Sequence, residues 1–183
     1  MDHLEAIVEI KNVVSNEFID KIIPLTDHKA KENLTVGRGT ICKDIRNVKG
    51  YHLNYEGVPT DVFYWNYIKN QIEKVYYFYK IKFPKMKSSK INQIDLLKYS
   101  IGGKYEIHTD HYTNNARHLS IIVNLNDGYE GGDLIFTDQK EKEIKRLKLG
   151  KGSIVFFPSN FMYPHAIQPI TKGTRYSIVA WLQ

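Results

Sequence analysis

The chain is 183 residues long, and its 42% hydrophobic and 25% charged residues are typical of a globular protein that folds as one domain around its own core. No apolar run approaches the ~20 residues that a membrane-spanning helix needs, and the single cysteine, Cys42, excludes an internal disulfide and a cysteine-rich zinc site. The formal net charge of +6 favours acidic partners only weakly.

The N-terminal part predicts helices. It opens on Asp2 and Glu5, where a secretory signal would carry positive charge, so we expect a cytoplasmic protein. Residues 15–28 predict a first helix with Ser15 as its N-cap, and residues 60–81 predict a second. In the second helix, apolar and aromatic side chains recur at helical spacing and should be buried: Trp65, Ile68, Ile72, Val75, Tyr76 and Tyr79.

Two other stretches of the first half have no clear period. Residues 33–60 predict loops over one end of a barrel, and such loops often carry substrate contacts. Candidates for substrate contact from the first half of the chain are Tyr51, His52 and Trp65. Residues 79–90 carry five lysines and no acid. A solvated loop is the more frequent explanation of such a run, and contact with an anionic partner is the alternative.

From Ile91 onward the pattern changes to short β-branched and aromatic runs separated by turn residues. Short strands without long helices between them indicate an antiparallel sandwich or barrel, and a double-sheet jelly roll suits eight strands. We therefore expect a mainly β fold with flanking helices, in which residues 1–90 support a jelly-roll core (a double-stranded β-helix, cupin-like) of residues 91–183. The runs are INQIDLLKYS, KYEIHTD, RHLSIIVNLN, GDLIFTD, EIKRLKL, GSIVFFP, PHAIQPI and TRYSIVAWL.

His108 and Asp110 are the first candidate metal ligands. Side chains alternate along a strand, so these two should project from one face, with Thr109 turned away. An imidazole and a carboxylate then meet at one point. Alone, the pair is a weak indication, because His-x-Asp also occurs by chance on exposed strand edges.

His165, at the start of a later predicted strand, supplies a third donor. Two histidines and one carboxylate form the facial triad of non-haem Fe(II) oxygenases, which leaves positions free for cosubstrate and O₂. A closed zinc site would need a fourth protein ligand, and none is obvious. The other histidines lack a partner at ligand spacing and should be surface or core residues: His3, His28, His52, His111 and His118.

Arg175 opens the last predicted strand, and Ser177 lies on the same face. A guanidinium fork beside a hydroxyl suits a carboxylate that is bound through two hydrogen bonds. The alternative is an ordinary arginine that faces solvent.

In this order, His108-x-Asp110, His165 and Arg175 resemble the Fe(II)/2-oxoglutarate-dependent dioxygenases, and the details are similar to the prolyl 4-hydroxylase branch. The stretch from Tyr99 through Gly102 and Tyr105 to Asp110 matches that branch's approach to its first iron ligand. The resemblance covers about residues 91–183, and the first half contributes nothing specific to it. Further blocks that resemble the branch are RHLSIIVNLND, EGGDLIF, GSIVFFPS and HAIQPITKGTRYSIVAWL.

The resemblance implies that His108, Asp110 and His165 hold Fe(II). It also implies that 2-oxoglutarate pairs its distal carboxylate with Arg175, helped by Ser177 and Tyr99, although Tyr99 also suits an ordinary buried position. O₂ would be the other cosubstrate, succinate and CO₂ the products, and ascorbate a reductant.

The sequence departs from the family pattern at two places. Residues 122–124 read Ile-Val-Asn where some relatives place a further cosubstrate-binding tyrosine. Arg175 stands where some collagen-type members use lysine, which favours microbial, viral and oxygen-sensing relatives.

The substrate is less determined than the reaction. Candidate substrate residues beside the iron strands are Tyr105, Tyr112 and Arg117, with Asn114 and Asn115. The first hypothesis is hydroxylation of a prolyl residue in a protein or peptide. The alternatives are oxidative dealkylation or hydroxylation of nucleic acid, for which the basic balance is the only support, and a jelly roll that binds a partner without turnover.

We also expect a three-residue hairpin loop, Thr171 to Gly173, with Gly173 in a left-handed conformation. A two-residue turn between paired strands would place His165 and Arg175 on opposite faces.

Overall fold

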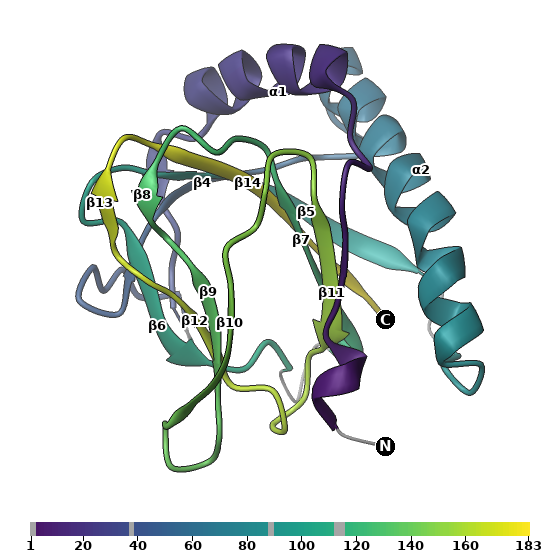
Figure 1. Ribbon diagram of the computed structural model, residues 1–183. Coiled ribbons are helices and arrows are strands. Elements are labelled where there is room, and N and C mark those ends of the chain that lie inside the picture. The colour runs from purple at the N-terminus through teal and green to yellow at the C-terminus, as the bar shows by residue number, and fades with distance from the viewer. Residues whose placement is uncertain (1–2, 37–38, 88–89, 112–115) are drawn as a thin grey trace.

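A computed structural model describes residues 3–36, 39–87, 90–111 and 116–183. Two antiparallel sheets face each other, and the helices α1 and α2 pack on the outer side of the larger sheet (Figure 1). The expected mainly β, double-sheet fold with flanking helices is therefore confirmed.

The larger sheet has seven strands in the order β1-β11-β7-β14-β5-β4-β2. The smaller sheet has five strands in the order β10-β9-β12-β6-β3, and β8 pairs with β13 separately. The bounds are β1 Val8–Ile10, β2 Glu32–Asn33, β3 Arg46–Asn47, β4 Lys49–His52, β5 Ile91–Tyr99, β6 Lys104–His108, β7 Leu119–Asn124, β8 Glu130–Gly131, β9 Leu134–Thr137, β10 Glu143–Leu147, β11 Ile154–Pro158, β12 His165–Ile167, β13 Ile170–Lys172 and β14 Arg175–Leu182.

Both predicted helices are present, after a short 3-10 helix at His3–Ala6. Helix α1 spans Asn16–Lys29, and the Ser15 hydroxyl accepts a hydrogen bond from the backbone of Phe18 at 3.3 Å, as an N-cap does. Helix α2 spans Pro59–Lys82, and all six of its expected core residues are buried. Neither helix, nor any other in the described ranges, has the length and apolar character to cross a membrane.

Alternation along β14 separates two hydrophobic cores. Ile178, Ala180 and Leu182 pack toward the helices, whereas Val179 and Trp181 belong to the core between the sheets. Strand β5 runs antiparallel beside β14, with Tyr99 opposite Arg175. The inner faces of these two central strands therefore form one continuous wall of the barrel interior.

The expectation of loops throughout residues 33–60 is wrong in part. Strand β3 extends the smaller sheet through its pairing with β6, and β4 extends the larger sheet through its pairing with β5. Strands of two to four residues are too short to show a period in sequence, and their partner strands decide their conformation.

The expected hairpin between the last two strands is also wrong. Strand β13 pairs with β8, while β14 lies in the larger sheet between β5 and β7. Gly173 has a φ of 75°, so its left-handed conformation is confirmed. The chain passes here from the β8–β13 pair to the larger sheet, so the residue count of a hairpin does not decide which way Arg175 points.

Candidate metal centre

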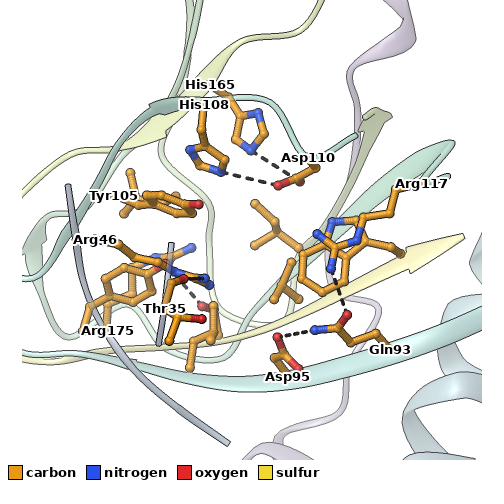
Figure 2. Close-up of a pocket in the computed structure, with 17 residues that line it drawn as sticks. Thr35, Arg46, Gln93, Asp95, Tyr105, His108, Asp110, Arg117, His165 and Arg175 are labelled. Atoms are coloured by element: carbon orange, nitrogen blue, oxygen red, sulfur yellow. Dashed lines mark hydrogen bonds and ion pairs between the residues drawn. The ribbon is translucent and has the colours of Figure 1, made fainter. Parts of the chain in front are cut away.

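Three donor side chains meet inside the barrel where β6 ends. His108 is the last residue of β6, His165 is the first of β12, and the two are partners in the ladder between these strands. Asp110, two residues after His108 in the chain, points toward both imidazoles (Figure 2). Ligand atoms of the three residues lie within 4.8 Å of one another. The structure therefore brings the three predicted residues together, and they are called the triad below.

The reason for the position of Asp110 differs from the one expected. Strand β6 stops at His108, so a turn rather than strand alternation directs the carboxylate inward. The Ser120 hydroxyl donates to Asp110 Oδ2 at 2.7 Å, and it lies 2.8 Å from the Ser159 hydroxyl. These buried contacts with β7 and the end of β11 fix the orientation of the carboxylate.

Both imidazoles present the same nitrogen to the centre of the triad. His108 Nδ1 lies 2.8 Å from the backbone oxygen of Glu106, and His165 Nδ1 lies 3.0 Å from that of Tyr163. A carbonyl oxygen only accepts hydrogen bonds, so Nδ1 carries the proton in each neutral ring. The two Nε2 atoms face the Asp110 carboxylate at 3.4 and 3.5 Å, with lone pairs available to a cation.

The electrostatics favour the protonation states that a metal needs. Burial would raise the pKa of Asp110, but the two imidazoles and the Ser120 hydroxyl hold it well below its usual range. Burial, with the nearby His108, lowers the pKa of His165 to about 4, against the opposing effect of Asp110. At neutral pH the triad therefore contains an ionised carboxylate and a neutral, coordinating His165.

Arg175 is a buried cation on the inner wall, only 1% exposed. Its Nη1 donates to the Ser177 hydroxyl at 3.1 Å, but its buried Nε and Nη2 have no hydrogen-bond partner among the described residues. The guanidinium carbon lies 5.2 Å from the centre of the Tyr99 ring. A buried charge without a counter-ion is costly, so this arrangement fits a bound anion.

A cavity of about 220 Å³ extends along this wall beneath the triad. Its lining forms three zones along β5 and β14, which are polar, apolar and polar in turn. Tyr99, Arg175 and Ser177 line one end, and apolar side chains line the middle. The middle is lined by Leu97, Ile122 and Val179. The far end is polar again except for Trp181, and its lining residues are Gln93, Asp95, Arg117 and Trp181.

The far end contains a hydrogen-bonded array that reaches the surface. Arg117 Nη2 donates to Gln93 at 2.8 Å, and Gln93 donates to Asp95 at 3.0 Å. His52 Nδ1 lies 2.7 Å from the other Asp95 oxygen. The Arg117 guanidinium also lies 3.6 Å from the centre of the Trp181 ring, so stacking and hydrogen bonding both fix its position.

Sequence reasoning missed Gln93 and Asp95. A signal was present, because they are the polar residues at alternate positions of an otherwise largely apolar strand, INQIDLL. Arg46 was also missed, although it lines the same cavity from β3. Its sequence context has no period, so its position follows only from the pairing of β3 with β6.

The remaining predicted residues are distributed as follows. Tyr105 lines the cavity and stacks on His108, with ring centroids 3.5 Å apart. Tyr51 contacts Asp61 of α2, and Trp65 is buried in the core beside the helices, so neither lines the cavity. Tyr112, Asn114 and Asn115 lie outside the described residues.

Comparison with known proteins identifies one family model and several relatives that match this chain. The family model for the 2OG-Fe(II) oxygenase superfamily matches residues 94–183. A PKHD-type hydroxylase of Idiomarina loihiensis is 23% identical over 181 residues, which cover 97% of this chain and 77% of that protein. A PKHD-type hydroxylase of Prochlorococcus marinus is 34% identical over 98 residues, 51% of this chain, and the match spans only 42% of that relative.

Solved structures share the fold of the whole chain. A prolyl hydroxylase of Trichoplax adhaerens, in complex with a peptide fragment of the hypoxia inducible factor oxygen degradation domain, superposes with a TM-score of 0.80 at 17% identity, covering 99% of this chain and 86% of the other. A Pseudomonas putida prolyl-4-hydroxylase gives a TM-score of 0.76 at 16% identity, covering 100% and 96%. At these identities the likeness shows the fold, which is the double-stranded β-helix.

Proposed function

Because the chain belongs to the 2OG-Fe(II) oxygenase superfamily, whose members use Fe(II), 2-oxoglutarate and O₂, we propose that it hydroxylates a prolyl residue of a protein or peptide. The observation that carries this proposal is the combination of the triad with a buried guanidinium that has no counter-ion, both in one cavity. We further propose that residues 1–183 work as one oxygenase domain, since strands from both halves line that cavity.

The triad fits Fe(II). Two neutral imidazole nitrogens and one carboxylate are the donor set of the facial triad, and no fourth protein ligand is present in the described cluster. When bound there, Fe(II) supplies the oxidative chemistry that couples conversion of 2-oxoglutarate to succinate and CO₂ with hydroxylation of the substrate. The hydrogen bonds at Nδ1 of His108 and His165 keep both rings oriented for coordination.

The inner wall holds the cosubstrate. Arg175 donates from Nε and Nη2 to the distal carboxylate of 2-oxoglutarate, while Ser177 fixes Nη1. Burial raises the pKa of Tyr99, so its hydroxyl stays protonated and donates to the same carboxylate. Leu97, Ile122 and Val179 exclude water between this end and the far end, which strengthens the ion pair.

The far end of the cavity holds the substrate. Stacking on Trp181 and the hydrogen bond to Gln93 hold the Arg117 guanidinium, which donates to a backbone carbonyl of the peptide. The Tyr105 ring is covered by His108 on one face and by Arg46 on the other, so it presents its edge to the cavity, and a proline ring packs against that edge. A peptide substrate is supported by the prolyl hydroxylases among the similar structures and by the peptide in the Trichoplax complex.

The test is turnover of 2-oxoglutarate with Fe(II) and ascorbate, with succinate as the readout, comparing wild type with the variants His108→Ala and Arg175→Ala. We expect succinate only with the wild type, and a gain of one oxygen on a proline-containing peptide by mass spectrometry. Equal turnover by all three proteins would remove the assignment. Loss of a methyl group from a methylated oligonucleotide, with no change in the peptide, would move the substrate to nucleic acid.

A further inference from the structure

A second guanidinium lines the cavity from the N-terminal half of the chain. Arg46 lies on β3, opposite Tyr105 in the ladder with β6. Its guanidinium carbon lies 4.6 Å from the centre of the Tyr105 ring, and its Nη1 donates to the backbone oxygen of Thr35 at 2.9 Å. Arg46 lies on the same side of the cavity as Arg175, away from Arg117 (Figure 2).

Arg46 has no counter-ion in the described part of the chain. Its Nε is buried without a hydrogen-bond partner. The two carboxylates that line the cavity are engaged elsewhere, Asp110 with the triad histidines and Asp95 with His52 and Gln93. Two partly or fully buried cations, Arg46 and Arg175, therefore share one end of the cavity, and no carboxylate of the described residues pairs with either.

The two charges act at one place. Burial raises the pKa of Tyr99, and the charges of Arg175 and Arg46 both oppose that rise. Both guanidinium groups are therefore close enough to the Tyr99 hydroxyl to stabilise negative charge there. Two like charges in a confined space repel each other, and an anion between them converts that repulsion into attraction.

We propose that Arg46 is a second cationic contact for 2-oxoglutarate, so that the dianion is held between two guanidinium groups rather than by Arg175 alone. This inference rests on the proposed function. The distal carboxylate of 2-oxoglutarate has two acceptor oxygens, so it can accept hydrogen bonds from both guanidinium groups. Arg46 completes the cosubstrate site from the opposite sheet, which gives the N-terminal half of the chain a part in binding.

Arg46 has a competing role, which is to support the Tyr105 ring that stacks on His108. In Figure 2 the Tyr105 ring lies between the other two groups. A guanidinium that only supports Tyr105 would act on the orientation of His108 and hence on metal affinity. A contact with 2-oxoglutarate would instead change cosubstrate affinity and leave metal affinity unchanged.

The experiment measures binding rather than turnover, by calorimetry on protein loaded with Mn(II) and kept free of oxygen. The ligands are 2-oxoglutarate and 2-oxopentanoate, which lacks the distal carboxylate. The variants are Arg46→Gln, Arg46→Lys and Arg175→Gln, and Lys43→Gln is the matched control, because it removes an exposed charge from the same segment outside the cavity. Mn(II) affinity is measured separately for each protein.

We expect Arg46→Gln to weaken 2-oxoglutarate binding about tenfold, as the loss of one charge-assisted contact does, and Arg46→Lys to restore most of it. Arg175→Gln should weaken it more, and Lys43→Gln should match the wild type. The role of Arg46 would be overturned if Arg46→Gln left 2-oxoglutarate affinity unchanged, or if it weakened Mn(II) binding as much as it weakened 2-oxoglutarate binding. Either result would leave the proposed function standing. Failure of the wild type to bind 2-oxoglutarate would overturn the proposed function itself.

Discussion

His108 and His165 face each other across the ladder between β6 and β12, and their ring centroids are 4.3 Å apart. Directly opposed residues of antiparallel strands have Cβ atoms about 5 Å apart, so strand pairing alone brings these distant residues to ligand spacing. A register shift of one residue would turn one imidazole out of the barrel. The register of β12 is therefore a condition for the proposed metal site.

Replacing His165 with alanine should abolish tight metal binding. Loss of a residue that hydrogen-bonds to a metal ligand typically costs about 10- to 100-fold in metal affinity, and loss of a ligand itself should cost more. We expect Mn(II) titration to show at least about a 100-fold weaker site, with the fold retained by circular dichroism. The exposed His28 provides the control, since His28→Ala should bind Mn(II) as the wild type does. Tight binding in both variants would contradict the assignment of the triad.

Ser120 is predicted to position Asp110. Its hydroxyl donates to Asp110 Oδ2 at 2.7 Å, from the interior of β7. Ser120→Ala should weaken Mn(II) binding by about tenfold, because the carboxylate loses the bond that orients it. Ser153→Ala removes another fully buried hydroxyl outside the cavity and should leave Mn(II) affinity unchanged. An equal effect of the two substitutions would indicate a general loss of stability instead.

Arg175→Met should separate stability from binding. The guanidinium is buried with two unpaired nitrogens, and a buried charge without a counter-ion destabilises the folded protein, so an apolar side chain of similar size should be tolerated or stabilising. We therefore expect the ligand-free variant to melt at or above the temperature of the wild type.

Addition of 2-oxoglutarate provides the second half of the Arg175 experiment. It should raise the melting temperature of the Mn(II)-loaded wild type and leave that of Arg175→Met unchanged. Arg146→Met is the control, because Arg146 is an exposed residue paired with Asp133 and Glu143. Equal ligand-induced stabilisation of both variants would show that Arg175 is not part of the anion site.

Much of the site could be predicted from the sequence because its residues sit in regular patterns. The inward side chains of β14 alternate with apolar ones, so Arg175 and Ser177 were recognisable as partners on one face. The convergence of the triad was also predictable, although the turn that carries Asp110 was not. The alternation of side chains identifies which residues share a face of a strand. The resemblance to the dioxygenase family identified the order of the metal ligands and Arg175 along the chain.

His52 was a candidate from the sequence, but the way in which the first half lines the cavity could not be predicted, for a physical reason. Arg46 and His52 lie on strands of two and four residues, which have no stable conformation without their partners β6 and β5. Their positions depend on contacts between residues far apart in the chain. The array at Asp95 is of the same kind, because its members come from β4, β5 and the segment before β7.

Gly131 is predicted to be essential for the turn that joins β8 to β9. Its φ is 75°, and a Cβ atom there would lie 2.2 Å from the backbone oxygen of Pro169. Gly131→Ala should destabilise the protein by at least about 2 kcal/mol in urea unfolding, because both the conformation and the space exclude a side chain. Gly128→Ala is the control, since a Cβ atom there meets nothing within 4 Å. Similar unfolding midpoints for the two variants would contradict the geometry of the turn.

The pair His52 and Asp95 should make stability depend on pH. The hydrogen bond that His52 donates to the Asp95 carboxylate raises the pKa of His52 above its ordinary value of 6.5, against a smaller opposing effect of burial. The folded protein therefore binds this proton more tightly than the unfolded chain. The resulting stability is fully present below about pH 6.5 and is lost as the pH rises through the higher folded pKa.

Urea unfolding between about pH 5.5 and 9 tests this coupling, with each variant compared with the wild type at every pH. His52→Gln and Asp95→Asn should both remove the part of the stability that declines above about pH 6.5, and the double variant should behave as either single one does. The effect should be modest, because the His52 side chain is 57% exposed and its charge is screened by solvent. His28→Gln should keep the wild-type profile. An unchanged pH profile in Asp95→Asn would mean that Asp95 does not hold the proton on His52.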